Sequence, residues 1–250
     1  MKIRLFCAGL ITVFSLPTFA QSYQGNTSIH SFNKAKKTLE RQVYHDHRIT
    51  LYCDAKFDKN KNITLPNGFT TEKHVKRAKR VEWEHVVPAE NFGRTFSEWR
   101  EGHDSCVNNK GKNFKGRKCA EKMNNEYRLM QSDLYNLYPA VGAVNATRSN
   151  YNFAMLPSSR SSFGVCEVKV QGRKVEPTVG SRGRIARTYL YMEQAYPRFR
   201  LSNQQKQLMN AWDKQFPVSE WECERAKRIE RIQKNRNHIV FERCEALKAK

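Results

Sequence analysis

Apolar residues recur along much of the chain at intervals of three and four positions, the spacing that places them on one face of a helix. The segments with this pattern are residues 32–45, 123–137 and 185–196, and the two stretches that follow residues 202 and 219. Ser31, Ser202 and Ser219 stand where helix N-caps are expected. The pattern predicts a mostly helical chain whose apolar faces, including that of residues 123–137, form the core.

Shorter segments favour strands and turns. Residues 48–57 (RITLYCDAKF) and 163–170 (FGVCEVKV) are rich in β-forming residues and predict strands, whereas GSRG at 180–183 predicts a turn. Pro139 suits the first turn of a short helix that carries Asn145. Because no repeat or low-complexity segment divides the chain, we expect one α+β domain, mostly helical with a small β component.

The first 20 residues, MKIRLFCAGLITVFSLPTFA, have the organisation of an export signal. Lys2 and Arg4 precede an apolar stretch, and a small residue, Ala20, ends the segment. The sequence predicts a signal peptide over 1–20 and a mature domain over 21–250. A membrane anchor is the alternative, but the apolar run is shorter than the ~20 residues that cross a bilayer.

The charge of the mature chain is strongly positive. The full chain carries a formal charge of +21, and removal of the signal leaves 43 basic against 24 acidic residues, or +19. A polyanion is therefore the first partner to consider. No later segment approaches transmembrane length, so we expect no membrane partner.

Six cysteines remain after cleavage, and none belongs to a CxxC pair. In an exported chain this pattern favours up to three disulfides over a zinc site. Six cysteines allow 15 pairings, among which the sequence does not choose. Short loops favour Cys106–Cys119 and Cys223–Cys244, which leaves Cys53 for Cys166.

Two segments concentrate the positive charge. Residues 71–80 (TEKHVKRAKR) and the Gly- and Asn-rich residues 101–119 each carry five Lys or Arg side chains. Solvated basic loops are the simpler interpretation of both. Residues 71–80, however, directly precede VEWEHVVPAENFG, which favours a role in phosphate contact.

VEWEHVVPAENFG places a carboxylate, Glu84, beside an imidazole, His85. Such a pair alone is weak evidence of chemistry, but basic segments flank it on both sides. The chain has neither HExxH nor GxSxG, which disfavours that class of zinc protease and a serine hydrolase with a nucleophile elbow. Adjacent strand residues point to opposite faces, so sharing one site requires a backbone bend or a cleft that wraps the strand edge. We expect an irregularity at Glu84 and His85.

Four segments resemble the bacterial endonuclease I family of periplasmic and secreted non-specific nucleases. They are RVEWEHVVPAENFG, GAVNATRSNYNF, RGRIARTYLYM and NAWDKQFPVSEWECERAKRI, in that order between about Arg80 and Cys244. The resemblance implies a ββα-metal (His-Me finger) site. In such a site His85 is the general base, and Glu84 and Asn145 hold one Mg²⁺, with Mn²⁺ or Ca²⁺ as alternatives.

These residue types suit phosphodiester hydrolysis on chemical grounds. Histidine titrates near neutral pH and can take a proton from water. Magnesium prefers oxygen ligands and keeps several waters, so one carboxylate and one amide suffice when a substrate phosphate joins them. By resemblance, Arg117 stabilises the phosphate in the transition state, although neighbouring lysines offer other registers.

Other candidates and departures concern the surroundings of the site. Arg148 and Arg187 are candidates for substrate phosphate contact, with surface salt bridging as the alternative. Gln131 and Tyr135 stand where the family usually has an acid and a histidine, and loss of a nearby acid is expected to alter the support of the site.

The function that the sequence favours is an exported, monomeric, Mg²⁺-dependent endonuclease in the periplasm or the medium, which cleaves DNA and also RNA. A non-catalytic cationic nucleic-acid-binding protein is one alternative, since it would share the charge but would not need Glu84, His85 and Asn145. An exported nuclease toxin is another, which would need a delivery region that 230 residues do not reveal.

Overall fold

The computed structural model describes residues 24–249, so the predicted signal peptide lies outside the described residues. Within this range helices alternate with small two- and three-stranded sheets, in agreement with the expected α+β class. One cluster of buried apolar side chains runs through the described elements. None of the helices between residues 24 and 249 has the length and hydropathy of a membrane span.

The N-terminal part forms a helix and a short hairpin. Its elements are α1 (Phe32–Thr38), the π-helix η1 (Leu39–Val43), β1 (Lys56–Phe57), β2 (Ile63–Thr64) and α2 (Val75–Ala78). The predicted cap is confirmed, because the Ser31 hydroxyl accepts a hydrogen bond from the Lys34 amide. The strand expected over residues 48–57 is wrong for most of its length, because residues 51–53 turn back and bury Leu51 in the core.

A strand pair followed by a helix lies at the centre of the molecule. Strands β3 (Val81–His85) and β4 (Leu137–Val141) pair antiparallel without interruption, and α7 (Gly142–Arg148) follows β4 and packs on both. The irregularity expected at Glu84 and His85 is therefore absent. The two side chains point to opposite faces of the pair, Glu84 toward α7 and His85 toward α1.

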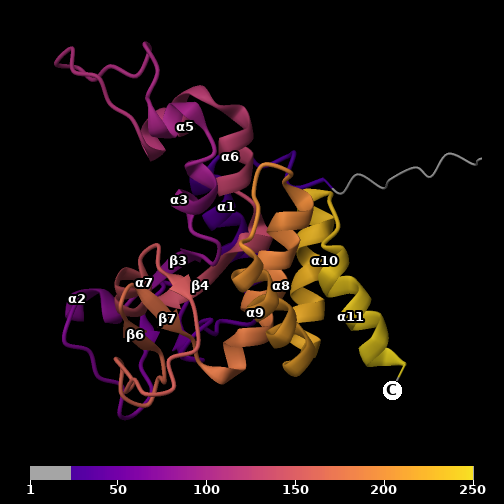
Figure 1. Cartoon of the computed structure of the whole chain (residues 1–250). Coiled ribbons are helices and arrows are strands. Elements are labelled where there is room, and N and C mark those ends of the chain that lie inside the picture. Colours follow the sequence, from indigo (N-terminus) through magenta and orange to yellow (C-terminus); the bar gives the residue numbers. More distant parts are fainter. Residues whose placement is uncertain (1–23, 250) are drawn as a thin grey trace, which may run out of the picture.

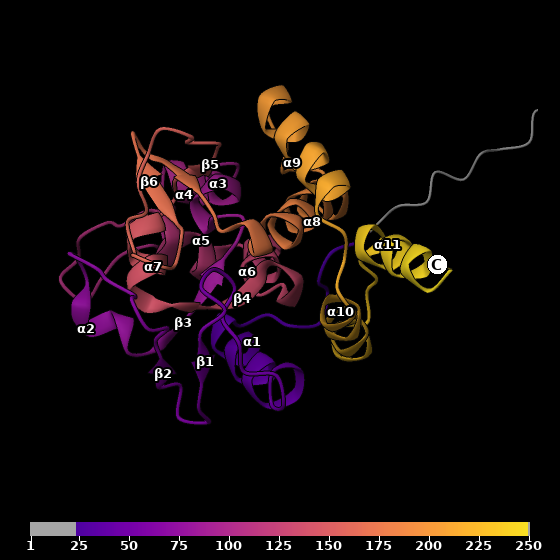
Figure 2. The same ribbon diagram turned by 90° about the horizontal axis from the view of Figure 1, so that it is seen from below.

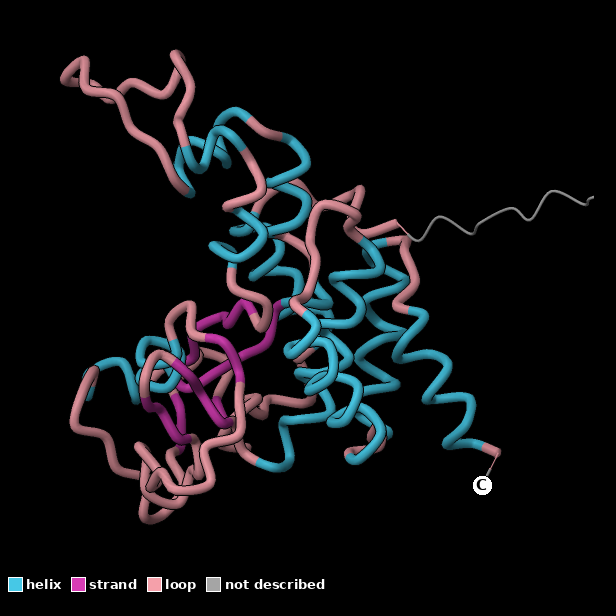
Figure 3. The backbone as a smooth tube through the Cα atoms, in the orientation of Figure 1, coloured by secondary structure: helices cyan, strands magenta, loops and turns pink. Residues whose placement is uncertain are grey.

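The segment between β3 and β4 adds short helices and one long loop. The helices are α3 (Ala89–Gly93), α4 (Ser97–Arg100), α5 (Arg117–Met123), α6 (Asn125–Gln131) and the 3₁₀ turn η2 (Leu134–Asn136). The loop of residues 101–116 projects from the body between α4 and α5 (Figures 1 and 3). The apolar positions of 123–137 are core from Tyr127 onward, as predicted. They do not form one helix, because Asn124 adopts extended backbone between α5 and α6.

Two local predictions fail where tertiary contacts decide the backbone. Pro139 lies inside β4 rather than in a helix, which a two-stranded sheet tolerates because each strand has an unpaired edge. Residues 180–183 are helical rather than a turn. A Cβ on Gly183 would lie 2.4 Å from the Phe216 carbonyl oxygen, so this glycine permits close packing within the helical region.

A three-stranded sheet follows α7. It contains β5 (Asn152–Phe153), β6 (Lys169–Gln171) and β7 (Lys174–Glu176) in the order β5–β7–β6. The strand predicted over 163–170 is confirmed only for its last two residues, since the others form turns and an isolated bridge.

The C-terminal part is helical. It consists of α8 (Val179–Ala195), α9 (Asn203–Gln215), α10 (Glu220–Gln233) and α11 (His238–Lys248). The caps predicted at Ser202 and Ser219 are confirmed by hydrogen bonds from the amides of Gln205 and Glu222. Both views place α8, α10 and α11 on one side of the molecule and the β3–β4 pair with α2 and α7 on the other (Figures 1 and 2).

Three disulfides join the cysteines in the two pairs that loop length favoured and in the pair that these left over. They are Cys53–Cys166, Cys106–Cys119 and Cys223–Cys244. The first ties the N-terminal part to the segment that leads into β6, the second closes the projecting loop onto α5, and the third joins α10 to α11. The N-terminal part, the projecting loop and the C-terminal helices are thus each covalently restrained.

Candidate active site

One cavity of about 380 Å³ gathers the residues that the sequence suggested. Its lining includes Glu84, His85, Arg117 and Asn145. The cavity lies at the C-terminal end of β3 and reaches both faces of the strand. Two neighbouring side chains with opposite directions can therefore serve one site without a bend in the backbone.

His85 is buried and held in one orientation. Its Nε2 lies 2.8 Å from the main-chain carbonyl oxygen of Gln131, and its ring centroid lies 4.8 Å from that of Phe32. A carbonyl only accepts hydrogen bonds, so Nε2 carries the proton and Nδ1 keeps its lone pair. Burial, and then the charge of Arg117, lower the pKa of His85 to about 3, which keeps the imidazole neutral.

Glu84 is buried on the other face of β3. Its Oε1 accepts hydrogen bonds from the Tyr52 hydroxyl at 2.6 Å and the Arg148 guanidinium at 2.8 Å. Burial raises the pKa of this carboxyl, and the two donors oppose that shift. Within residues 24–249 both partners bond to Oε1, which leaves Oε2 as the oxygen with which Glu84 can meet a ligand.

Asn145 projects from α7 toward the same strand. Its Nδ2 donates to Glu82 Oε2 at 2.9 Å, and Glu82 is held in turn by Arg77. The amide nitrogen is thereby engaged, and the carbonyl oxygen Oδ1 remains as a ligand atom. The approach of α7 depends on Gly142, because a Cβ there would lie 2.5 Å from the Arg77 carbonyl oxygen.

Arg117 is exposed at the mouth of the cavity. It was expected in a polar loop, but it is the first residue of α5, directly after the projecting loop. Cys119, two residues later, is buried and bonded to Cys106. The disulfide therefore anchors the helical turn that carries the guanidinium.

Arg148 is not available to a substrate phosphate in this structure. It is 1% exposed and donates to Glu84 Oε1 and to the carbonyl oxygens of His85 and Val86. It thus binds the side chain of one site residue and the main chain of the next. Its contacts favour a positioning role in place of phosphate contact or a surface salt bridge.

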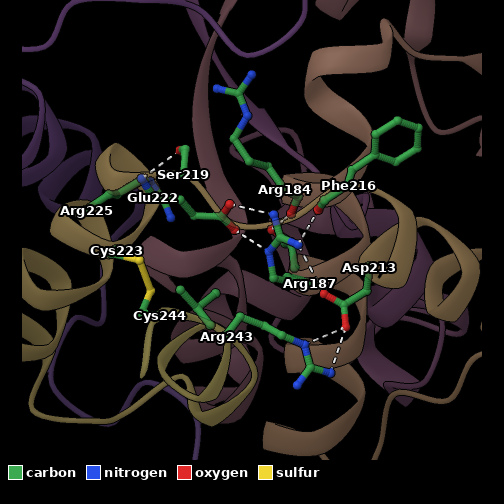
Figure 4. A network of polar contacts seen from close by, with 12 residues as sticks. Arg184, Arg187, Asp213, Phe216, Ser219, Glu222, Cys223, Arg225, Arg243 and Cys244 are labelled. Carbon is green, nitrogen blue, oxygen red and sulfur yellow. Dashed lines mark hydrogen bonds and ion pairs between the residues drawn. A yellow bond between two sulfur atoms is a disulfide. The ribbon is translucent and has the colours of Figure 1, made fainter. Parts of the chain in front are cut away.

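Arg187 is equally buried but lies in the helical part, outside the cavity. It donates to both carboxylate oxygens of Glu222 and to Asp213, which also binds Arg243 (Figure 4). Its guanidinium also reaches the Phe216 carbonyl oxygen at 2.9 Å. The expected phosphate contact by Arg187 is therefore not supported, because its donors already serve α9, α10 and the loop between them.

The two departures from the family pattern have different consequences. Gln131 holds His85 through its main-chain oxygen, which the change of side chain does not remove, while its side-chain Nε2 is buried with no hydrogen-bond partner among the described residues. Tyr135 bonds to the carbonyl oxygens of Ala226 and Asn235, away from the cavity. Neither departure removes a residue that the sequence predicted as a ligand or as the base.

Several contributors had no clear signal in the sequence. Tyr52 lies 32 residues before Glu84, and Phe32 reaches the site from α1. Glu82 could have been found, because it lies two residues before Glu84 and therefore on the same strand face. The Gln131 carbonyl is a main-chain group and leaves no side-chain pattern.

Comparison with known proteins identifies the class. A sequence model of the endonuclease I family matches residues 19–243. The chain belongs to the endonuclease I family, a family of nucleases.

Individual relatives match along nearly the whole chain. An extracellular deoxyribonuclease of Aeromonas hydrophila is 38% identical over 243 residues, which cover 94% of this chain and 96% of the relative. A periplasmic deoxyribonuclease of the same species is 36% identical, with 98% of this chain and 97% of the relative covered. Endonuclease-1 of Buchnera aphidicola subsp. Acyrthosiphon pisum is also 36% identical, with 93% of this chain and 89% of the relative covered.

Proposed function

We propose that the protein is a Mg²⁺-dependent endonuclease that hydrolyses phosphodiester bonds of DNA, and also of RNA, without sequence preference. The observation that carries the proposal is the single cavity lined by a neutral histidine, a carboxylate, an amide and an exposed arginine. The deoxyribonuclease names of the relatives support DNA as the substrate. The protein acts in the periplasm or the medium, where such relatives are named and where disulfides persist.

His85 acts as the general base in this proposal. Its Nε2–H is engaged by the Gln131 carbonyl, so Nδ1 is the atom that accepts a proton from the attacking water. Phe32 packs on the ring and limits its rotation. The lowered pKa of His85 keeps Nδ1 free of a proton before the reaction, and the developing charge of the phosphate can stabilise the imidazolium afterwards.

Glu84 and Asn145 would hold the metal. Oxygen ligands are the type that magnesium prefers, and two protein ligands leave room for water and substrate. The arrangement fits, because the partners of Glu84 bond to Oε1 and Glu82 engages the amide nitrogen of Asn145. When bound, magnesium neutralises charge on the phosphate and the departing oxygen.

Arg117 would bind the same phosphate as the metal does. Its side chain is exposed at the cavity, so its donors can meet phosphate oxygens as these gain charge. Arg148 supports the site indirectly by fixing Glu84 and the carbonyl of His85. The proposed chemistry acts on phosphate oxygens, which carry no sequence information, and this favours cleavage without sequence preference. A monomer suffices, because one chain lines the cavity with the histidine, the two ligands and the arginine.

Conversion of supercoiled plasmid to the nicked form tests the proposal. With Mg²⁺ we expect nicking and then fragmentation, and excess EDTA should stop both because the phosphate loses its metal. Mn²⁺ and Ca²⁺ added after EDTA identify the ions that restore activity, and a labelled RNA tests the second substrate. A plasmid that is bound but stays intact under all conditions would favour the non-catalytic cationic protein instead.

A further inference from the structure

A second cavity, about 830 Å³ in volume, adjoins the catalytic one. We call it the lysine groove and define it by Phe32, Lys36, Lys37, Lys61, Arg80 and Trp83. One wall comes from α1, the other from the turn between β1 and β2, and the first residues of β3 lie along its floor. Phe32, Trp83 and Asn145 line both cavities, so the groove opens directly into the catalytic site.

The cations of the groove differ in how far they are neutralised. Lys61 pairs with Glu40 at 3.0 Å. Lys37 and Arg80 are exposed and form no salt bridge with any residue of 24–249, although the charge of Arg80 helps to lower the pKa of the Glu82 carboxyl, which also lines the groove. Arg77 is a useful contrast, since it belongs to the same basic segment as Arg80 but is bound to Glu82. The positive charge left at the groove is therefore chiefly that of Lys37, Arg80 and Lys36.

The length of strand β3 gives the distance between the groove and the catalytic site. Val81 lines the groove, and Glu84 lines the catalytic cavity three residues later. A strand rises about 3.3 Å per residue, so the two positions are about 10 Å apart. Successive phosphates of a duplex strand advance about 3.4 Å along the axis, so the groove lies within about three nucleotides of a phosphate in the site.

The apolar part of the groove suits the rest of a nucleotide. Phe32 and Trp83 are partly exposed, and Lys36 Nζ lies 4.7 Å above the Phe32 ring. Rings beside cations can contact sugars and bases without selecting a sequence. Phe32 also packs on His85, so one side chain touches both the strand path and the base.

We propose that the lysine groove is a subsite for the nucleic-acid strand, binding phosphates within about three nucleotides of the cut through Lys37 and Arg80. The inference rests on the proposed function, since it presupposes cleavage in the adjoining cavity. It goes further in assigning one direction of the strand path to α1 and the β1–β2 turn. It also gives Arg80, alone among the cations of residues 71–80, a place in the groove.

The test compares two double variants of equal charge. Lys37→Gln/Arg80→Gln removes two cations of the groove that form no salt bridge. Lys36 is kept, because it contacts the ring of Phe32, which packs on His85. Lys214→Gln/Lys227→Gln removes two exposed cations of α9 and α10 and serves as the control. Each protein is assayed with a labelled oligonucleotide duplex and with bis(p-nitrophenyl) phosphate, a diester too small to fill both cavities. Binding to the duplex is measured in EDTA over a range of salt.

The groove variant should raise KM for the duplex roughly tenfold relative to KM for the small diester. The slope of log affinity against log salt should decrease by about 2 in the groove variant, because two phosphate contacts are lost. The control should keep the wild-type slope. Equal effects of both variants, or a wild-type salt slope in the groove variant, would overturn the subsite. If wild type cleaves neither substrate with Mg²⁺, the proposed function fails, while the salt slopes in EDTA still decide whether the groove binds a strand.

Discussion

Two sides of the molecule use arginine in different ways. One carries the candidate active site at the end of β3 and is called the catalytic side; the other consists of α8–α11 and is called the helical side. Among α8–α11, Arg187 is 1% exposed and its charge is met by two carboxylates. Beside the cavity of the candidate active site, Arg117 is exposed and forms no salt bridge with another residue of 24–249. Arg148 combines both situations, because it is buried but binds a residue of the site. A charge of +21 therefore says little until each cation is placed, since a buried pair supports the fold and an exposed cation supports binding.

The largest effect should come from the catalytic side. His85→Ala removes the group that takes the proton from water, and loss of a general base typically costs ~10²–10⁴-fold in rate. Duplex binding should change little, because the buried ring contributes no charge to the surface. Turnover on plasmid and affinity in EDTA measure the two effects separately.

His30→Ala is the matched control, because His30 is exposed and lies outside the cavity. It should keep wild-type turnover. If His85→Ala retained more than about a third of that turnover, the imidazole would not be the base.

On the helical side, Arg187→Met should affect stability rather than chemistry. It leaves Glu222 buried without its partner, and breaking a buried pair in this way costs about 3–5 kcal/mol. The double variant Arg187→Met/Glu222→Leu removes both charges of this pair, while Asp213 keeps its hydrogen bonds from Arg243, so it should recover most of that loss. Urea unfolding gives the free energies, and plasmid nicking of the folded fraction should stay near wild type.

Arg231→Met provides the comparison with an exposed pair. Arg231 lies 3.8 Å from Glu224 and is 71% exposed, so its loss should cost less than about 1 kcal/mol. Equal costs for Arg187→Met and Arg231→Met would show that burial does not distinguish the two kinds of arginine.

Removing a disulfide on the catalytic side should lower both stability and activity, whereas removing one on the helical side should lower stability alone. Closing a loop of the size of Cys106–Cys119 contributes about 3 kcal/mol in the chain-entropy model, and Cys223–Cys244 contributes a similar amount. Cys106→Ser/Cys119→Ser also frees the turn that positions Arg117, and misplacing a catalytic group by about 1 Å can cost up to ~10²-fold. Its nicking activity should fall well below that of Cys223→Ser/Cys244→Ser at a temperature where both are folded.

Wild-type protein made under reducing conditions should then gain nuclease activity on oxidation, as free thiols disappear. Such behaviour would protect the chromosome of the producing cell before export. The link to Arg117 would be refuted by equal activity of the two serine pairs, or by full activity of the reduced protein with Mg²⁺ present.

Local signals in the sequence were sufficient for features that neighbours along the chain determine. Serine caps depend on an amide three residues later, and Ser31, Ser202 and Ser219 were all predicted. The grouping of Glu84 with Asn145 came from a family resemblance, and the structure brings both to one cavity. Their metal remains a prediction.

Distant partners account for what the sequence did not reveal. Arg187 is buried because Glu222 meets it from another helix, 35 residues away, and a guanidinium in a sequence has the same appearance whether it binds an acid or a phosphate. Pro139 is in a strand because β3, more than 50 residues earlier, pairs with it. The bend expected beside His85 proved unnecessary because the cavity surrounds the strand end, a shape that many separate segments create together.

The smallest effect concerns Arg228, an arginine whose acidic partner, Asp46, is exposed. Asp46 accepts two hydrogen bonds from Arg228, which lower the pKa of this carboxyl to about 2. A lowered pKa means that the pair stabilises the fold above the unfolded-state pKa of about 3.9, and that this contribution is lost as the pH falls through about 2. Because Asp46 is half exposed, solvent screening should limit the cost of Asp46→Asn to less than about 1 kcal/mol at pH 7. Urea midpoints of the two proteins should differ at pH 7 and converge toward pH 2; a difference that grows with acidification would contradict the assigned direction.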